Sequence, residues 1–202
     1  MKALLSTTYF GPVQWYQKLY RHKEVQIEQW ESFLKQTYRN RCLIATTQGI
    51  QALTVPVERG TSQQIRDIRI SDHGNWRHLH WNALMSAYGE SPFFEYYQDD
   101  IRLFFEGRWV YLFDFNEAIR EKMCELLDIQ PKVTFSSTYH YPADISLTSD
   151  YREAINPKHP QPDPDFEPKP YYQVYQQKHG FLPNLSILDL LFNMGPESIF
   201  YL

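Results

Sequence analysis

The sequence predicts an α/β fold: a Rossmann-like, mainly parallel sheet with packed helices and an added β-hairpin. Three observations predict it. The first thirty residues have the pattern strand, helix, strand; two later apolar runs flank a short glycine-containing link; and three further segments carry apolar residues at helical spacing. A length of 202 residues is typical of one domain, so we expect residues 1–202 to form a single domain.

The opening segment has the pattern of a βαβ unit. Ala3–Tyr9 is apolar and rich in β-branched residues, and it ends at a Gly-Pro turn, which is typical of a strand. Pro12 is tolerated in the first turn of a helix, and an aromatic stripe at helical spacing follows over residues 13–20. Val25 and Ile27 then alternate with polar residues, as in a half-buried second strand.

The middle of the chain predicts a hairpin and three helices. Cys42–Thr46 and Ala52–Val57 are strand-like runs around a short link, and Pro56 places the second run at an edge. Asn75 is a candidate N-cap for a helix from Trp76 to Tyr88. The same spacing predicts helices over residues 93–105 and 115–126, and a strand over residues 133–139.

The last quarter of the chain combines a proline-rich loop with a terminal helix. Residues 156–170 hold six of the thirteen prolines, and proline lacks the N–H that a regular element needs, so we expect an extended loop there. Ser186 is a candidate N-cap for the helix that follows, with Asp189 three residues on, in the pattern of a capping box.

Composition excludes several classes of protein. Twenty basic and twenty-four acidic residues give a net charge of −4, which disfavours a dedicated nucleic-acid binder. The N-terminus lacks the pattern of a secretory signal, and no run approaches the ~20 apolar residues of a membrane span. Two cysteines, Cys42 and Cys124, indicate no disulfide framework. We therefore expect a cytoplasmic protein with reduced thiols.

Two polar segments are candidate ligand sites. Lys35, Arg39 and Arg41, beside Asn40, are suited to a phosphate or carboxylate through charge-assisted bonds, although a solvated turn explains such a run as well. Asp72 and His73 precede the first long helix, where a histidine is suited to acid–base catalysis, although both residues also fit an exposed loop.

Motifs for common cofactors are absent from the sequence. No CxxC, HExxH, P-loop, GxGxxG or GxSxG pattern occurs, so the sequence predicts no metal site and leaves any cofactor unknown. Asn184 precedes the terminal helix and is less well explained by capping than Ser186, so it is a candidate for bonding a ligand's hydroxyl or amide.

Four motifs together resemble the WbqC-like family, bacterial proteins associated with surface-polysaccharide (O-antigen) gene clusters. The opening Tyr-Phe-x-Pro turn matches residues 9–12, and a Phe-x-Lys segment leading to Asn-Arg matches residues 33–41. The Trp-Arg helix start with its later Tyr and Pro-Phe matches residues 76–93. The most specific motif, Pro-Asn-Leu-Ser-Ile-x-Asp, matches residues 183–189.

The chain also departs from the family pattern, for example at Trp15, where many members have a glycine after the opening turn. Many members carry Gln-Pro where this chain has Thr7 and Thr8. Paired acids usually end the second strand, whereas here Gln29 and Trp30 stand there, with Glu28 and Glu31 on either side.

The resemblance implies work on an activated sugar, and two hypotheses follow. The first is a transferase that adds a small acyl or aminoacyl group to a sugar nucleotide. The second is a non-catalytic protein that binds glycan precursors or partner proteins of the same pathway. In either case we expect a cleft at the carboxyl ends of the first strands, where open α/β sheets bind ligands. The oligomeric state stays open.

Nine residues are predicted to border that cleft. The phosphate or carboxylate would be held by Lys35, Asn40 and Arg41, with Arg77 as a further cation. The ring would stack on Tyr9 and Trp76, and a polar group would be oriented by Asn184. His73, next to Asp72, would move the proton.

Overall fold

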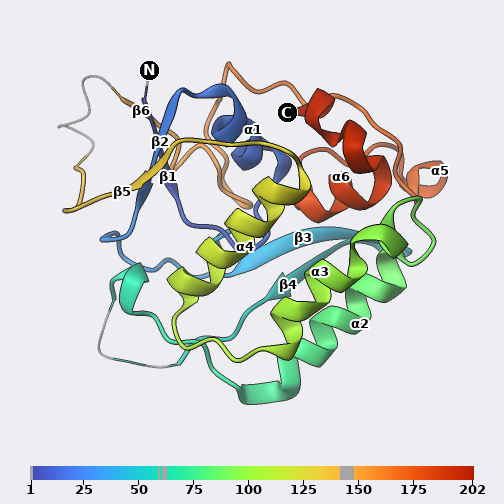
Figure 1. Cartoon of the computed structure of the whole chain (residues 1–202), viewed down its shortest axis with the longest axis horizontal. Coiled ribbons are helices and arrows are strands. Elements are labelled where there is room, and N and C mark those ends of the chain that lie inside the picture. The colour runs from blue at the N-terminus through green and yellow to red at the C-terminus, as the bar shows by residue number, and fades with distance from the viewer. Residues whose placement is uncertain (1, 59, 61–62, 142–147) are drawn as a thin grey trace.

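A four-stranded parallel sheet is the centre of the computed structural model, which describes residues 2–58, 60, 63–141 and 148–202 (Figure 1). The strands lie in the order β5-β2-β1-β6, and every pairing is parallel. Their bounds are β1 (Lys2–Ser6), β2 (Glu24–Glu28), β5 (Val133–Phe135) and β6 (Thr148–Asp150). The predicted α/β class, with a parallel sheet, is confirmed.

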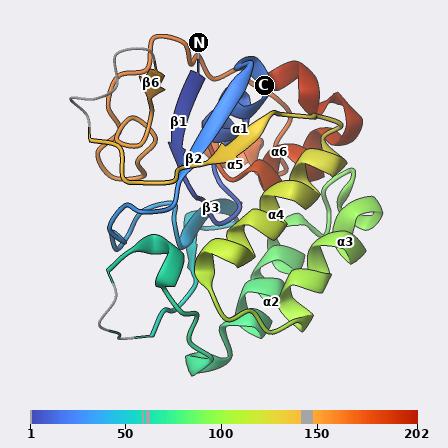
Figure 2. The ribbon, with the colours of Figure 1, turned by 60° about the vertical axis from the view of Figure 1, so that its left-hand side comes forward.

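The strand order creates a topological switch point between β1 and β6. From β1 the chain passes to β2 and then to β5 on one side, whereas β6 pairs with the other side of β1. Figure 2 shows β1, β2 and β5 side by side. Open parallel sheets bind ligands in the crevice outside the carboxyl ends of the strands at such a point. The fold therefore directs attention to the loops after β1 and β6.

The opening βαβ unit forms as predicted, with α1 (Val13–Arg21) between β1 and β2. The first strand is shorter than the sequence suggested. Residues 7–9 leave the ladder, and the N–H of Tyr9 donates to the carbonyl of Tyr38 at 2.9 Å. β1 is buried on both faces, which is why its sequence is a continuous apolar run and does not alternate.

The predicted hairpin is a separate antiparallel pair, β3 (Arg41–Thr46) and β4 (Gly49–Thr54). Thr47 and Gln48 form the two-residue link, and Gly49 follows with a φ of 107°, which favours glycine. The hairpin crosses the middle of the molecule, between the parallel sheet and the helices α2 and α3 (Figure 1). It contacts α2 and α6 through β3.

The remaining helices largely follow the predicted ranges, except for a short helix over residues 176–179 that was not predicted. They are α2 (Trp76–Tyr88), α3 (Phe94–Glu106), α4 (Leu112–Leu126), α5 (Gln176–His179) and α6 (Ile187–Met194). Within the described part of the chain, no helix is both long and apolar enough to cross a membrane. Residues 156–170 contain no helix or strand.

One predicted helix cap and one predicted capping box are not found in the structure. Asn75 stands at the start of α2, but it has a φ of 48° and its side chain makes no capping hydrogen bond. Ser186 does cap α6 by accepting from the N–H of Leu188. Asp189 does not complete a capping box, because the N–H of Ser186 donates to Leu43 instead.

The carboxylate of Asp189 is the centre of a buried hydrogen-bond cluster. It accepts from the hydroxyls of Tyr88 at 2.9 Å and Tyr171 at 2.7 Å, and from the amide of Gln173 at 2.9 Å. These donors come from α2 and from the segment that precedes α5. Asp189 therefore joins three distant parts of the chain at α6.

The Asp189 cluster predicts a pH dependence of stability. Burial raises the pKa of this carboxyl from 3.8 to about 6, although the three hydrogen bonds oppose the rise. Because the folded state holds the proton more tightly, the group's stabilising contribution is complete below about pH 4 and is lost as the pH rises through about 6. A difference of about two pKa units corresponds to about 3 kcal/mol.

We therefore expect the free energy of unfolding to fall by about 3 kcal/mol more in the wild type than in Asp189→Asn when the pH is raised from about 4 to about 7. Urea unfolding of both proteins across this range measures the difference. Parallel stability profiles for the two proteins would contradict the prediction.

Candidate functional site

Four loops meet at the carboxyl edge of the parallel sheet. Residues 7–8 follow β1, residues 29–34 follow β2, residues 136–141 follow β5, and residues 151–153 follow β6. All four strands run in the same direction, so their carboxyl ends lie at one edge. Residues that are far apart in the sequence are thereby brought together.

The first buried charge cluster joins the loops after β1 and β2. Arg39 forms a bidentate ion pair with Glu31, with Nε and Nη2 at 2.9 and 2.6 Å from the two carboxylate oxygens. Both side chains are more than nine-tenths buried. Ser6 at the end of β1 donates to Glu31 and accepts from Arg39. This geometry fixes the guanidinium of Arg39 beside the end of β1.

The second cluster surrounds Glu28, the last residue of β2. Its side chain is fully buried and accepts from Ser136 Oγ at 2.6 Å, from the N–H of Trp30 at 2.9 Å, and from the N–H and ring Nδ1 of His140 at 3.0 Å each. Burial alone would raise the pKa of the Glu28 carboxyl, but these hydrogen bonds together lower it. Glu28 therefore stays ionised and holds the segment after β5 against β2.

Arg152, just after β6, extends this second cluster toward the switch point. Its guanidinium donates to both carboxylate oxygens of Asp150 and to the carbonyl of His140. Its Nη1 lies 3.8 Å from Glu28, and its central carbon lies 5.3 Å from the ring centre of Tyr139. Arg152 and Arg39 are thus two buried cations at the same edge of the sheet.

These clusters form one side of a cavity of about 560 Å³, which we call the sheet-edge cavity. Its walls include three aromatic residues, Trp30, Tyr139 and Tyr141, and five charged residues, Glu31, Arg39, Asp150, Arg152 and Glu153. Its size and its mixture of aromatic and polar groups are typical of a small-molecule site. Among the described residues, no group of three or more His, Cys, Asp or Glu is placed to hold a metal ion.

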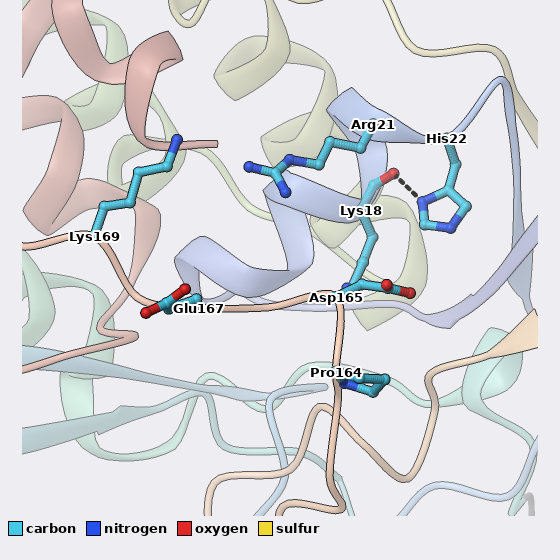
Figure 3. Close-up of a pocket in the computed structure, with 7 residues that line it drawn as sticks. All are labelled: Lys18, Arg21, His22, Pro164, Asp165, Glu167 and Lys169. Atoms are coloured by element: carbon cyan, nitrogen blue, oxygen red, sulfur yellow. Dashed lines mark hydrogen bonds between the residues drawn. The ribbon is translucent and has the colours of Figure 1, made fainter.

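A second cavity of about 520 Å³ lies between α1 and residues 164–169 (Figure 3). Figure 3 shows Arg21 and Lys169 extending toward the same opening. Both already serve the fold, because Arg21 donates to the carbonyl of Leu202 and Lys169 to that of Phe200. Lys18, which also lines it, pairs with Asp163 at 2.7 Å and thereby holds the proline-rich loop on α1. The sheet-edge cavity, unlike this second cavity, lies at the carboxyl ends of the parallel strands, so it is the better candidate site.

The structure places the two predicted stacking residues in the aromatic core. Tyr9 is 0% exposed and Trp76 is 4% exposed. The ring centres of both lie within about 6 Å of Phe115, at 5.8 and 6.0 Å, and the hydroxyl of Tyr9 pairs with His80 Nδ1 at 2.8 Å. Protein side chains thus already pack against both rings.

Asn40 and Arg41 lie at the start of the hairpin, whereas Lys35 lies in the loop between β2 and β3. Asn40 is buried and donates to the carbonyl of Val55, and Arg41 donates to Thr54 on the opposite strand. Lys35 is exposed, beside Leu34, which lines the sheet-edge cavity. These hydrogen bonds connect the two strands of the hairpin and the segments beside them, so Asn40 and Arg41 each stabilise the fold.

The other predicted residues are in two further places. Asp72 pairs with Arg77 at 2.6 Å at the start of α2, where His73 is exposed. Asn184 accepts from the N–H of Gln14 at 2.9 Å and so caps α1 from the opposite end of the chain. The nine predicted residues do not surround one cavity, and none lines the sheet-edge cavity. Their contact with a ligand stays a prediction.

Sequence reasoning did place a cleft at the carboxyl ends of the first strands, but it selected other side chains. It missed Tyr139 and Tyr141, because the strand predicted over residues 133–139 ends at Phe135 and leaves both in the loop that follows. It missed Arg152, because β6 is three residues long and was not predicted. It considered Arg39 only as part of a cationic run. The signal that could have found Glu31 and Arg39 was their position in the sequence. Glu31 comes shortly after the predicted strand at residues 25–27, and Arg39 shortly before the predicted strand at residues 42–46.

The buried ion pair predicts a large effect of Glu31→Gln. The substitution leaves the guanidinium of Arg39 buried without its carboxylate, so we expect the free energy of unfolding to fall by about 3 kcal/mol. Glu58→Gln is the control, because the Glu58–Arg69 pair is half exposed and its loss should cost less than about 1 kcal/mol. Chemical denaturation measures both, and equal losses would contradict a special role for the buried pair.

Comparison with known proteins gives one family and one relative. The family model described as the WbqC-like protein family matches residues 7–159 and 163–201. The chain is 29% identical over 193 residues to the uncharacterized protein Rv1507c of Mycobacterium tuberculosis (strain ATCC 25618 / H37Rv), an alignment that covers 84% of this chain and 83% of that protein. No solved structure matches the chain.

Proposed function

The chain belongs to the WbqC-like protein family, and on this premise we propose that it transfers a small acyl or aminoacyl group to a sugar nucleotide in surface-polysaccharide synthesis. We place the substrate in the sheet-edge cavity. The observation that carries this proposal is the pairing of an aromatic wall, Trp30, Tyr139 and Tyr141, with two buried guanidiniums, Arg39 and Arg152.

Each wall of the cavity suits one part of a sugar nucleotide. Tyr and Trp present an apolar face with a polar edge, which favours stacking with a base or a sugar ring. Guanidinium groups bind phosphate through charge-assisted hydrogen bonds. Both guanidiniums are held by protein carboxylates, so they are positioned before a ligand arrives and lose little freedom on binding.

A transfer step also needs a proton acceptor. A sugar hydroxyl or amine attacks the carbonyl carbon of the acyl donor, the new C–O or C–N bond forms, and the donor's leaving group departs with the bonding electrons. The nucleophile's proton must go to a base. Glu153 lines the cavity and has no ion-pair partner among the described residues, so we propose it for this role.

Tyr141→Ala tests the location of the substrate. Its side chain is 63% exposed at the cavity, so removing the ring should spare the fold and weaken binding of a sugar nucleotide about tenfold. Tyr96→Ala is the matched control, because Tyr96 is 76% exposed on α3 and does not line the cavity. Titration calorimetry with a panel of sugar nucleotides measures both.

The same titration distinguishes this location from the one predicted by sequence. If Lys35→Ala and Arg41→Ala weaken binding while Tyr141→Ala does not, the ligand lies along the hairpin and the sheet-edge cavity is wrong. Lys35 and Arg41 are outside the cavity, so a ligand confined to it should leave both variants close to the wild type.

Glu153→Gln tests catalysis. We expect it to retain sugar-nucleotide binding but to lose transfer by about a hundredfold, the size of a typical general-base effect. The assay incubates protein, sugar nucleotide and candidate acyl donors and follows the mass of the sugar nucleotide. Binding without any mass change in the wild type would instead favour the second hypothesis, a non-catalytic protein that binds glycan precursors.

A further inference from the structure

A further cavity, of about 340 Å³, lies between the start of α2 and the end of α3, and we call it the α2–α3 cavity. The two helices pack against each other, and the hairpin separates them from the parallel sheet (Figure 1). Among the described residues, none lines both this cavity and the sheet-edge cavity. The α2–α3 cavity is therefore separate from the proposed substrate site.

Three arginines from different segments line the α2–α3 cavity. Arg77 is in the first turn of α2, Arg102 is near the end of α3, and Arg108 follows α3. The lining that the structure describes contains one carboxylate, that of Glu106. The cavity thus concentrates positive charge in a chain whose net charge is −4, and this concentration favours an anionic ligand.

Nearby carboxylates balance only part of this charge. Arg77 Nη1 lies 2.6 Å from Asp72 Oδ1, and Arg102 Nε lies 2.6 Å from Glu106 Oε1. Arg108 has no such partner among the described residues, because its Nη1 lies 3.8 Å from Asp72 Oδ2, beyond hydrogen-bond distance, and its side chain is 86% exposed. Three guanidiniums and two carboxylates leave one positive charge in excess.

Arg102 and Arg108 are both accessible to a ligand. The Arg102–Glu106 pair joins neighbouring turns of α3, and both of its side chains are half exposed. Exposed pairs of this type contribute little to stability, because solvent screens them and holding two long side chains in one geometry costs entropy. An anion in the cavity can therefore replace Glu106 as the partner of Arg102 while it also binds Arg108.

Arg77 and two aromatic residues strengthen the attraction for an anion. Nε and Nη2 of Arg77 are buried and have no hydrogen-bond partner among the described residues. These two atoms do not reach a ligand, but the charge of the guanidinium acts at a distance. Trp81 and Phe105 give the cavity an apolar wall, beside which water screens charges less than in open solvent.

We infer that the α2–α3 cavity binds a phosphate group of a small anionic ligand. Arg102 and Arg108 donate to the phosphate oxygens, and Arg77 adds its charge. Phosphate suits the site better than a carboxylate, because it carries up to two negative charges and its oxygens point toward guanidiniums from more than one segment. The inference goes beyond the proposed function, since it assigns a second ligand site. It also gives Arg77 an anion-binding role in a cavity that Lys35 and Arg41 do not line.

Arg102→Gln and Arg108→Gln test the inference, with inorganic phosphate and pyrophosphate as probes in calorimetric titrations at constant pH and ionic strength. We expect each variant to bind the preferred probe about fivefold more weakly than the wild type, and the double variant at least about tenfold more weakly. Both side chains are exposed, so the midpoint of urea unfolding should stay close to that of the wild type. The probe that binds more tightly shows whether one or two phosphate groups fit the cavity.

Glu106→Gln should have the opposite effect, because it removes the carboxylate that competes with the ligand for Arg102. We expect it to bind the probe about fivefold more tightly than the wild type. The Glu58–Arg69 pair supplies matched controls, because it is also half exposed and neither residue lines the α2–α3 cavity. Glu58→Gln and Arg69→Gln change the net charge by the same amounts, and because solvent and salt screen distant charges, both should bind the probe within about twofold of the wild type.

The remaining outcomes separate this site from the proposed function. If the wild type binds neither probe, or if the Arg102 and Arg108 variants bind it no more weakly than Arg69→Gln, the cavity is not a phosphate site, even when a sugar nucleotide binds at the sheet edge. Unchanged or weaker binding by Glu106→Gln would also overturn the inference. Tyr141→Ala should bind both probes as the wild type does, and a loss in that variant would place the phosphate at the sheet edge. If sugar-nucleotide binding depends on Arg108 and not on Tyr141, the phosphate site stands and the proposed location of the substrate is wrong.

Discussion

The buried ion pair between Glu31 and Arg39 is the constraint on which the candidate site depends. It joins the loop after β2 to the segment that leads into the hairpin, and Ser6 adds the end of β1 through hydrogen bonds to both partners. Asn116 of α4 donates to the main-chain carbonyl of Arg39. A buried charge pair of this kind is costly to break, so the four segments keep one relative position.

The second cluster connects the ends of β2, β5 and β6 in a similar way. Glu28 ends β2 and holds His140, and Arg152 connects that histidine's carbonyl to Asp150 at the end of β6. Each carboxylate thereby fixes the position of a donor group. The result is a pair of positioned cations at the switch point, which is where a parallel sheet of this order provides a crevice.

The aromatic residues serve two purposes that composition alone does not distinguish. Tyr9 and Trp76 pack around Phe115 in the core, far from solvent, whereas Tyr139 and Tyr141 are exposed at the cavity. The residue type alone does not show whether a tyrosine is buried or exposed, because burial depends on contacts with distant segments. This is why the prediction of a stacking role for Tyr9 and Trp76 drew on the family motif and not on position in a fold.

The sequence by itself determined the α/β class, the opening βαβ unit, the hairpin and the helix ranges, because hydrophobic periodicity and turn residues are local properties. It also placed the cleft at the carboxyl ends of the first strands. Only the tertiary structure decided which side chains line it. β6 has three residues and no periodicity of its own, and it exists because β1 pairs with it. The pairing of β1 with β6 brings Arg152 close to Arg39. Pairing between strands that are far apart in the sequence depends on the packing of the whole chain, so the residues beside each strand do not predict it.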